Sequence, residues 1–242
     1  MAPPFDLSVA SYNIHKGVGT DRRRDLARTA AVIGEIGADI LALQEADTRF
    51  GPRKGLLDLD SLRRDLGLIA VPMQGVGQAH GWHGNLLLVR NALVQQVHQV
   101  ILPGLEPRGA LVTDLVLAGQ PLRVVNAHLG LLSASRAAQA RALIDKIAQL
   151  DGRPTLLLGD LNEWRDKSPA FRTLARHFTI APARASFPSR YPVLALDRMM
   201  LSSHGELRDV AAHDTPLARR ASDHLPIKAA LRFGPQNGTV PP

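Results

Sequence analysis

The chain of 242 residues contains no cysteine, and this absence limits the chemistry that it can perform. Without thiols, neither a disulfide framework nor a thiolate zinc site can form. Any metal ion must therefore be held by oxygen or imidazole ligands. Aromatic residues are also scarce, at 4% of the sequence, so few side chains can stack on unpaired bases. That scarcity weighs against a dedicated DNA-repair enzyme.

Long apolar runs are missing as well. No stretch approaches the ~18 consecutive apolar residues of a membrane span. Residues 1–6 lack the basic segment and the apolar core of a secretory signal. We therefore expect a cytoplasmic protein, which we take to be a monomer.

Positive charge is in excess. The sequence has 29 lysines and arginines against 22 aspartates and glutamates, which gives a formal net charge of +7. Such a charge attracts polyanions such as nucleic acid, or an anionic membrane surface on which the protein could make a peripheral contact. A chain rich in arginine and alanine can equally reflect a biased genome, and both interpretations stay open.

The hydrophobic pattern predicts alternating strands and helices. With 45% hydrophobic residues, we expect a single domain over residues 1–242, with a core at about 7–233 and a frayed tail at 234–242. Strands are predicted at 7–13, 40–44, 68–72, 85–90, 94–101, 110–117, 122–127, 155–159, 197–202, 207–212 and 226–233, and helices at 22–36, 61–66, 133–150 and 169–175. Residues 118–121 are predicted to be a hairpin turn, so the central region is antiparallel. We expect two mixed β-sheets that pack face to face and are flanked by helices.

Short acidic and amide motifs close several of these apolar stretches. They are Ser11-Tyr12-Asn13, Leu43-Gln44-Glu45, Asn126-Ala127-His128-Leu129, Gly159-Asp160-Leu161-Asn162, Leu196-Asp197-Arg198 and Ser222-Asp223-His224. Polar residues that end successive buried strands converge on one edge of a sheet, where α/β enzymes place their sites. We interpret this edge as a divalent-metal phosphodiesterase site.

Asp160 and Asn162 follow a very apolar strand. In extended geometry, residues two apart point the same way, so both side chains would face the site. The same Gly-Asp-x-Asn sequence is also common as an Asx turn. The surrounding motifs favour the functional interpretation.

Ser222-Asp223-His224 places a carboxylate beside an imidazole. The pKa of histidine lies close to physiological pH, so His224 can serve as an acid, a base or a metal ligand. Asp197 is the type of buried acid that could accept the Nδ1 hydrogen of His224 and fix its tautomer. Alternatively, Asp197 could pair with Arg198 or belong to a turn.

Asn13 and Glu45 end the first two predicted strands. Carboxylate and amide oxygens are hard ligands that suit Mg²⁺ or Mn²⁺, which use only one or two carboxylates and keep several waters. Glu45 could also be an acid at a strand end that faces solvent. That alternative leaves unexplained why five such residues lie at strand ends, namely Asn13, Glu45, Asp160, Asn162 and Asp223.

Together, the six motifs resemble the endonuclease/exonuclease/phosphatase superfamily, which includes DNase I, abasic-site nucleases, sphingomyelinases and inositol polyphosphate 5-phosphatases. The likeness runs from about residue 7 to residue 233 and is closest to compact bacterial members. It implies a four-layer α/β sandwich, a Mg²⁺ or Mn²⁺ cofactor and in-line attack of water on a phosphodiester.

The resemblance also implies roles for individual residues. Glu45 would be the principal metal ligand, with Asn13 and Asp223 beside the metal. Asp160 would orient or deprotonate the attacking water, and Asn162 would contact the phosphate. His224, paired with Asp197, and His128 would stabilise the developing charge or protonate the leaving oxygen. Asn126, Arg108 and Arg53 are the expected substrate-binding residues.

Some features depart from the best-known relatives. The tyrosine that abasic-site nucleases carry after their equivalent of Asn126 is missing here, where Leu131, Leu132 and small residues occur. The acidic partner that DNase I provides for its equivalent of His128 is not identifiable. His83 and Asn85 lie nearby in the expected topology.

Three functions follow from this sequence. The first is a nuclease or general phosphodiesterase, favoured by the complete catalytic set and the positive charge. The second is a lipid head-group or inositol-phosphate phosphodiesterase or phosphatase, which exposed apolar loops would support and for which Trp82 and Trp164 are the strongest residues. The third is a catalytically silent binding module, which loss of Glu45, Asp160 or His224 would have favoured.

Overall fold

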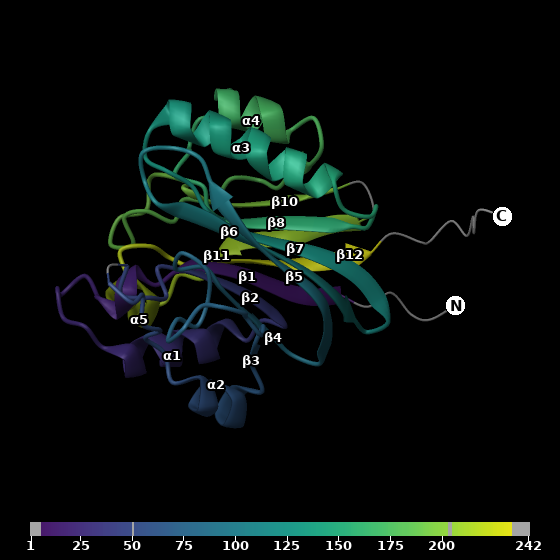
Figure 1. Ribbon diagram of the computed structural model, residues 1–242. Coiled ribbons are helices and arrows are strands. Elements are labelled where there is room, and N and C mark those ends of the chain that lie inside the picture. The colour runs from purple at the N-terminus through teal and green to yellow at the C-terminus, as the bar shows by residue number, and fades with distance from the viewer. Residues whose placement is uncertain (1–5, 50, 203–204, 234–242) are drawn as a thin grey trace.

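Two six-stranded sheets face each other in the computed structural model, which describes residues 6–49, 51–202 and 205–233 (Figure 1). The first sheet has the order β11 (Gly205–Ala212), β12 (Ile227–Phe233), β1 (Asp6–Asn13), β2 (Ile40–Gln44), β4 (Leu86–Val89) and β3 (Ile69–Ala70). The second has the order β5 (Ala92–Leu102), β6 (Arg108–Leu117), β7 (Gln120–His128), β8 (Thr155–Asp160), β10 (Asp197–Leu201) and β9 (Thr179–Ile180). The tail predicted at 234–242 lies outside the described residues.

Each sheet is mixed, with one parallel pair near its middle. β1 and β2 run parallel in the first sheet, and β7 and β8 run parallel in the second, while the other neighbouring strands are antiparallel. The predicted hairpin joins β6 to β7 through Ala118 and Gly119, whose φ angles of 50° and 78° match a two-residue hairpin turn. The carboxyl ends of both parallel pairs lie at one edge, where Asn13 at the end of β1 donates to Asp160 at the end of β8.

Helices cover the outer face of each sheet. α1 (Leu26–Ile36), α2 (Leu59–Leu66) and α5 (Pro216–Ala221) lie below the first sheet in Figure 1, and α3 (Ser133–Ala148) and α4 (Pro169–Leu174) lie above the second. The predicted four-layer α/β sandwich is confirmed. None of the helices in the described ranges is long and apolar enough to span a membrane.

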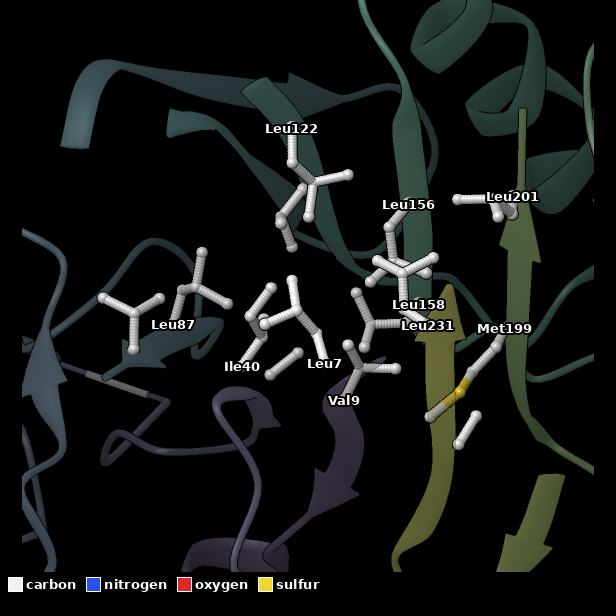
Figure 2. Close-up of a cluster of buried hydrophobic side chains, with 14 of the residues drawn as sticks. Leu7, Val9, Ile40, Leu87, Leu122, Leu156, Leu158, Met199, Leu201 and Leu231 are labelled. Atoms are coloured by element: carbon white, nitrogen blue, oxygen red, sulfur yellow. The ribbon is translucent and has the colours of Figure 1, made fainter. Parts of the chain in front are cut away.

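Three apolar clusters hold the four layers together. The central cluster lies between the sheets, where Leu7 and Val9 of β1 and Leu156 and Leu158 of β8 are fully buried (Figure 2). Leu157, between the last two, belongs instead to the cluster under α3 and α4. Successive strand residues face opposite sides, so a strand buried on both faces must be apolar throughout.

Some predicted elements have different bounds. α1 begins at Leu26 rather than at residue 22, because the Asp25 side chain caps it by accepting from the Arg28 amide at 2.9 Å. The strand predicted at 68–72 shrinks to Ile69–Ala70. α5, β9 and a 3-10 helix at His15–Gly17 were not predicted, because elements of two to six residues show too little periodicity.

Candidate active site

Polar side chains from both sheets meet at the edge where the parallel strands end. Asn13 pairs with Gln44 at the end of β1 and β2, and His128 pairs with Asp160 at the end of β7 and β8. The backbone before Asp160 is tightly constrained, since a Cβ atom on Gly159 would lie 1.9 Å from the carbonyl oxygen of Ala127. Glycine is therefore required there to bring Asp160 into place.

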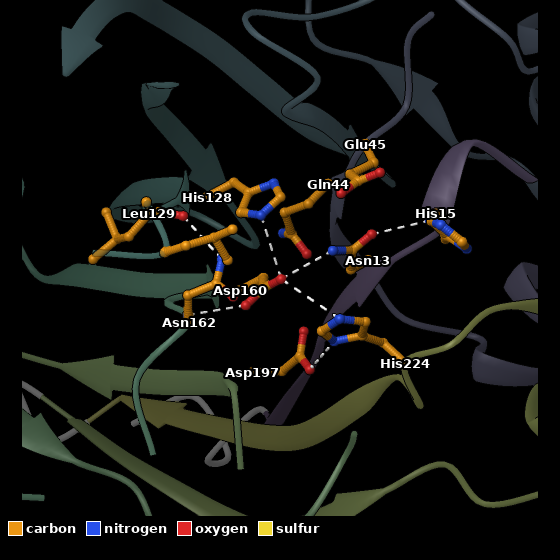
Figure 3. A network of polar contacts seen from close by, with 12 residues as sticks. Asn13, His15, Gln44, Glu45, His128, Leu129, Asp160, Asn162, Asp197 and His224 are labelled. Atoms are coloured by element: carbon orange, nitrogen blue, oxygen red, sulfur yellow. Dashed lines mark hydrogen bonds and ion pairs between the residues drawn. The ribbon is translucent and has the colours of Figure 1, made fainter. Parts of the chain in front are cut away.

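Asp160 is the centre of this arrangement (Figure 3). Its Oδ2 accepts from the Asn13 amide at 2.9 Å and lies 3.4 Å from His128 Nε2 and 3.7 Å from His224 Nε2. The residue is 1% exposed. Burial raises its pKa to about 6, with His224 opposing the rise and the Asp197 carboxylate adding to it. Such a carboxyl can exchange a proton near neutral pH.

His224 and Asp197 form a buried pair. The His224 Nδ1 lies 2.8 Å from Asp197 Oδ2, the pairing predicted from the sequence. The Ser186 hydroxyl donates to the same oxygen at 2.5 Å, while Asp197 Oδ1 is buried without a hydrogen-bond partner. Burial alone would lower the pKa of His224, but Asp197 and Asp160 raise it to about 10. His224 is therefore an imidazolium at neutral pH.

His128, unlike His224, is neutral. Its ring nitrogens lie 3.0 and 2.9 Å from Nη1 of Arg108, whose guanidinium is held by Glu106 at 2.8 Å. Burial and the Arg108 charge lower the pKa of His128 well below its usual range, so the ring is neutral. The nearby groups considered from the sequence do not contact it, because His83 Nδ1 lies 2.9 Å from the Pro107 carbonyl and Asn85 donates to the Trp82 and Gly109 carbonyls.

Asn162 leaves the extended conformation that the sequence suggested. Its φ angle is 51°, in the left-handed region. The backbone N–H of Asn162 donates to Asp160 Oδ1 at 3.0 Å, and its side-chain amide donates to the Leu129 carbonyl at 2.9 Å. The expectation of parallel side chains is wrong because the Asx turn forms. This turn orients the carboxylate of Asp160 and ties the loops after β7 and β8 together.

Asn126 is the clearest correction among the predicted substrate-binding residues. Its side chain is fully buried, donates to the carbonyls of Leu43 and Leu86 at 3.0 and 3.1 Å, and accepts from Gln44 at 2.9 Å. An amide whose groups are engaged inside the protein does not reach a substrate. Asn126 joins the two sheets instead.

Glu45 turns toward the same edge from the end of β2. Its side chain is 17% exposed and forms an ion pair with Lys16, which lies in the 3-10 helix after β1. Burial is the largest influence and opposes ionisation of Glu45, but Lys16, His15 and Arg108 together outweigh it and lower the pKa of Glu45. Lys16 was not identified from the sequence. Its place three residues after Asn13 was the available signal.

Arg53 and Asp223 lie at the margins of the site. Arg53 forms an ion pair with Asp47 at 2.8 Å and lines a cleft together with Lys16, Glu45, Arg49, Arg108 and His128. Asp223 lies beside the 3-10 helix after β1, where its Oδ1 is 3.6 Å from His15 Nδ1. The predicted residues therefore all reach this edge, with Asn126 directed inward.

Two groups of ligands could hold a metal ion. Asp160, Asp197 and His224 each place one ligand atom within 4.8 Å of the others. Asp197 and Asp160 raise the pKa of His224, so its imidazolium would have to lose a proton before it could be a ligand there. The second possible ligand is Glu45, whose carboxylate is paired with Lys16. Its oxygen atoms suit a hard divalent ion such as Mg²⁺.

Comparisons with known proteins agree with this geometry. The sequence matches the endonuclease/exonuclease/phosphatase family over residues 10–224. The uncharacterized protein YbhP of Escherichia coli strain K12 is 32% identical over 256 residues, which cover 95% of this chain and 97% of YbhP. TDP2 of D. rerio, solved with a single-strand DNA product, has a TM-score of 0.71 at 18% identity and covers 93% of this chain and 98% of its own. The mannosyl-6-phosphatase Bt3783 of Bacteroides thetaiotaomicron has a TM-score of 0.74 at 17% identity, covering 94% and 100%. At these identities the two structures show a shared fold.

Proposed function

Because the chain belongs to the endonuclease/exonuclease/phosphatase family, we propose that it is a metal-dependent phosphodiester hydrolase, and first of all a nuclease or general phosphodiesterase. The observation that carries this proposal is the placement of Asp160. Its buried carboxylate lies within 3.7 Å of a neutral imidazole and an imidazolium, beside an amide donor. A base next to several donors is what hydrolysis of a phosphate ester requires.

Each residue has a distinct task in the proposed reaction. Asp160 accepts the proton of the attacking water, and Asn13 and the Asn162 amide hold its carboxylate in place. The His224 imidazolium donates to the phosphoryl oxygens as negative charge develops. Neutral His128 donates its one N–H to the phosphate or the leaving oxygen.

Glu45 is the principal residue that would hold Mg²⁺ or Mn²⁺, with Asn13 and Asp223 beside it. When bound, the ion would polarise a phosphoryl oxygen and neutralise part of its charge. The Lys16 ammonium pairs with Oε2 of Glu45 and balances its charge.

A hydrolysis panel tests this function. Bis-p-nitrophenyl phosphate, single- and double-stranded DNA, RNA, sphingomyelin and inositol phosphates are compared with Mg²⁺, with Mn²⁺ and with a chelator. We expect metal-dependent turnover that Glu45→Ala and Asp160→Ala abolish. Glu206→Ala, at an exposed acid on β11 with an Arg208 partner, is the matched control and should retain turnover. Turnover that survives the chelator or both substitutions would contradict the proposal.

A further inference from the structure

Exposed apolar side chains gather at the same edge as the catalytic residues. Nine large apolar side chains are exposed in the described part of the chain. Six of them lie on the loops before β6, after β7, after β8 and before β10, at the end of these strands that carries His128, Asp160 and Asp197. They are Leu105 (86% exposed), Leu131 (65%), Leu132 (53%), Trp164 (49%), Tyr191 (79%) and Val193 (73%), which we call the apolar edge. Apolar side chains that gather around a site usually mark a surface that contacts something.

The loops that carry the apolar edge are bonded to one another. Glu106, next to Leu105, accepts from the Leu131 amide at 2.6 Å. Buried Arg136 donates to the Leu131 carbonyl and forms an ion pair at 3.0 Å with Glu163, next to Trp164. The Leu161 amide donates to the Leu196 carbonyl, which ties the loop after β8 to the segment that carries Tyr191 and Val193. These bonds hold the loops of the apolar edge in place relative to one another.

Positive charges accompany these apolar groups. Glu163 has two guanidinium partners, Arg136 and Arg165, so one positive charge of the three groups is left over. Exposed Arg165 lies 5.6 Å from the centre of the Trp164 ring. Arg190, beside Tyr191, is exposed and donates to the Thr20 carbonyl at 2.8 Å, without a carboxylate partner among the described residues. Aromatic rings next to arginines are typical of side chains at a membrane interface.

We propose that the apolar edge docks the protein on a bilayer that contains anionic lipids, so that the catalytic centre faces an amphipathic phosphate ester in that bilayer. The substrate assignment rests on the proposed function, whereas docking does not. Leu105, Leu131, Leu132 and Val193 are aliphatic and cannot stack on bases, but they gain free energy when they leave water for lipid. The unpaired arginine charge complements the anionic head groups.

From the sequence, both Trp82 and Trp164 were expected to support binding to lipid. The structure corrects this expectation for Trp82. Trp82 packs against the central apolar cluster, and its Nε1 donates to the Val100 carbonyl at 3.0 Å. Trp164 is therefore the indole that can reach a membrane. This difference provides a local probe, because the chain has two tryptophans.

Vesicle binding tests the docking surface independently of catalysis. The full chain is sedimented, in the presence of EDTA, with vesicles of phosphatidylcholine alone or of equal parts phosphatidylcholine and phosphatidylglycerol. We expect binding to the mixed vesicles that weakens with added salt. A chain that stays in the supernatant with the mixed vesicles overturns the proposal. Binding is measured without a divalent metal and without turnover. A failure of the hydrolysis panel would therefore leave this result unchanged.

Paired variants locate the contact. Leu105→Ser/Leu131→Ser should weaken the partition coefficient for mixed vesicles by about 10-fold or more, because two exposed leucines no longer enter the lipid. The matched control is Ile69→Ser/Leu93→Ser, at side chains that are 51% and 65% exposed away from this edge. The thermal unfolding midpoint establishes that each variant is folded. Equal binding by both double variants overturns the proposal.

Trp164 fluorescence gives the third measurement. In a Trp82→Phe chain, the emission of Trp164 should shift to shorter wavelength with mixed vesicles and be quenched by brominated lipid. Emission that does not respond to vesicles, but is quenched by single-stranded oligonucleotide, would assign the apolar edge to nucleic acid and overturn the membrane proposal.

Discussion

The parallel pair β7–β8 carries buried charged groups at both ends. At one end, Arg123 lies opposite Thr155, and at the other, His128 lies opposite Asp160. Arg123 is 1% exposed and donates to Asp114 at 2.7 and 2.9 Å and to the carboxylate and carbonyl of Asp151 at 2.6 and 2.9 Å. Asp160 is equally buried, yet its closest donors are neutral amides, and the imidazolium nitrogen lies 3.7 Å away.

The two ends differ in how completely their buried charges are paired. The Arg153 and Arg123 guanidinium groups lower the pKa of Asp151 to about 2, whereas burial raises the pKa of Asp160 to about 6. A carboxylate that is paired with two guanidinium groups holds no proton near neutral pH. An incompletely paired carboxylate can take up a proton. Asp197, beside Asp160, is also incompletely paired, because its buried Oδ1 has no hydrogen-bond partner.

The largest effect is expected at the catalytic end. Asp160→Asn should lower kcat/KM for bis-p-nitrophenyl phosphate by about 10³-fold, because the amide cannot accept the proton of water. Urea unfolding should change by about 1–3 kcal/mol, because one amide oxygen replaces the two carboxylate oxygens that accept from Asn13 and from the Asn162 backbone N–H. Activity within tenfold of the wild type would show that Asp160 is not the base.

At the Arg123 end of the strand pair, we expect a loss of stability without a loss of turnover. Arg123→Leu should cost about 3–5 kcal/mol in urea unfolding, because Asp114 is left buried without its partner. Adding Asp114→Leu should recover most of this loss, since a buried ion pair is close to neutral when both members are replaced. In both variants the folded fraction should keep wild-type kcat. A fall in kcat would mean that the two ends are coupled.

The pH profile sharpens the contrast. We expect kcat/KM to rise through about pH 6, as the Asp160 carboxyl loses its proton and becomes able to act as a base. It should fall again as the pH approaches about 10, where the His224 imidazolium loses its charge. Asp197→Asn should move the alkaline fall to lower pH, since a charge that raises the pKa of His224 is gone. An unmoved alkaline fall would assign it to another group.

The smallest effect is expected for Asp151→Asn. The Asp151 side chain is 60% exposed, so water already screens its pairing with Arg123 and Arg153. We expect a loss below about 1 kcal/mol in urea unfolding. A loss as large as that of Arg123→Leu would mean that Asp114 alone does not satisfy the guanidinium.

Strand positions and the shared edge followed from the sequence because both depend on local patterns. Runs such as Leu156–Leu158 are apolar on both faces, and the polar residue after each run must lie where the strand ends. Asp160, His224 and Asp197 were found in this way. The short helix α5 was missed because Thr215 and Pro216 start a helix of six residues, too short for an apolar periodicity to appear.

Contacts that depend on packing between distant segments were not predictable. Lys16 reaches Glu45 because both residues have positive φ angles, 57° and 53°, after neighbouring strands. Arg108 reaches His128 only through the pairing of β6 with β7. The sequence also could not tell that Asn126 points inward, since an amide at a strand end suits either direction.

The inward direction of Asn126 has a consequence for motion. Two sheets joined only by apolar side chains could slide along each other at little cost, because such contacts are not directional. Hydrogen bonds from one β7 amide to the carbonyls of Leu43 and Leu86 on β2 and β4 oppose that sliding. Glu45 follows β2, and His128 ends β7, so a shear between the sheets would change the separation of the proposed metal ligand Glu45 and the proposed catalytic residue His128. The buried hydrogen bonds of Asn126 therefore limit sliding of one sheet over the other.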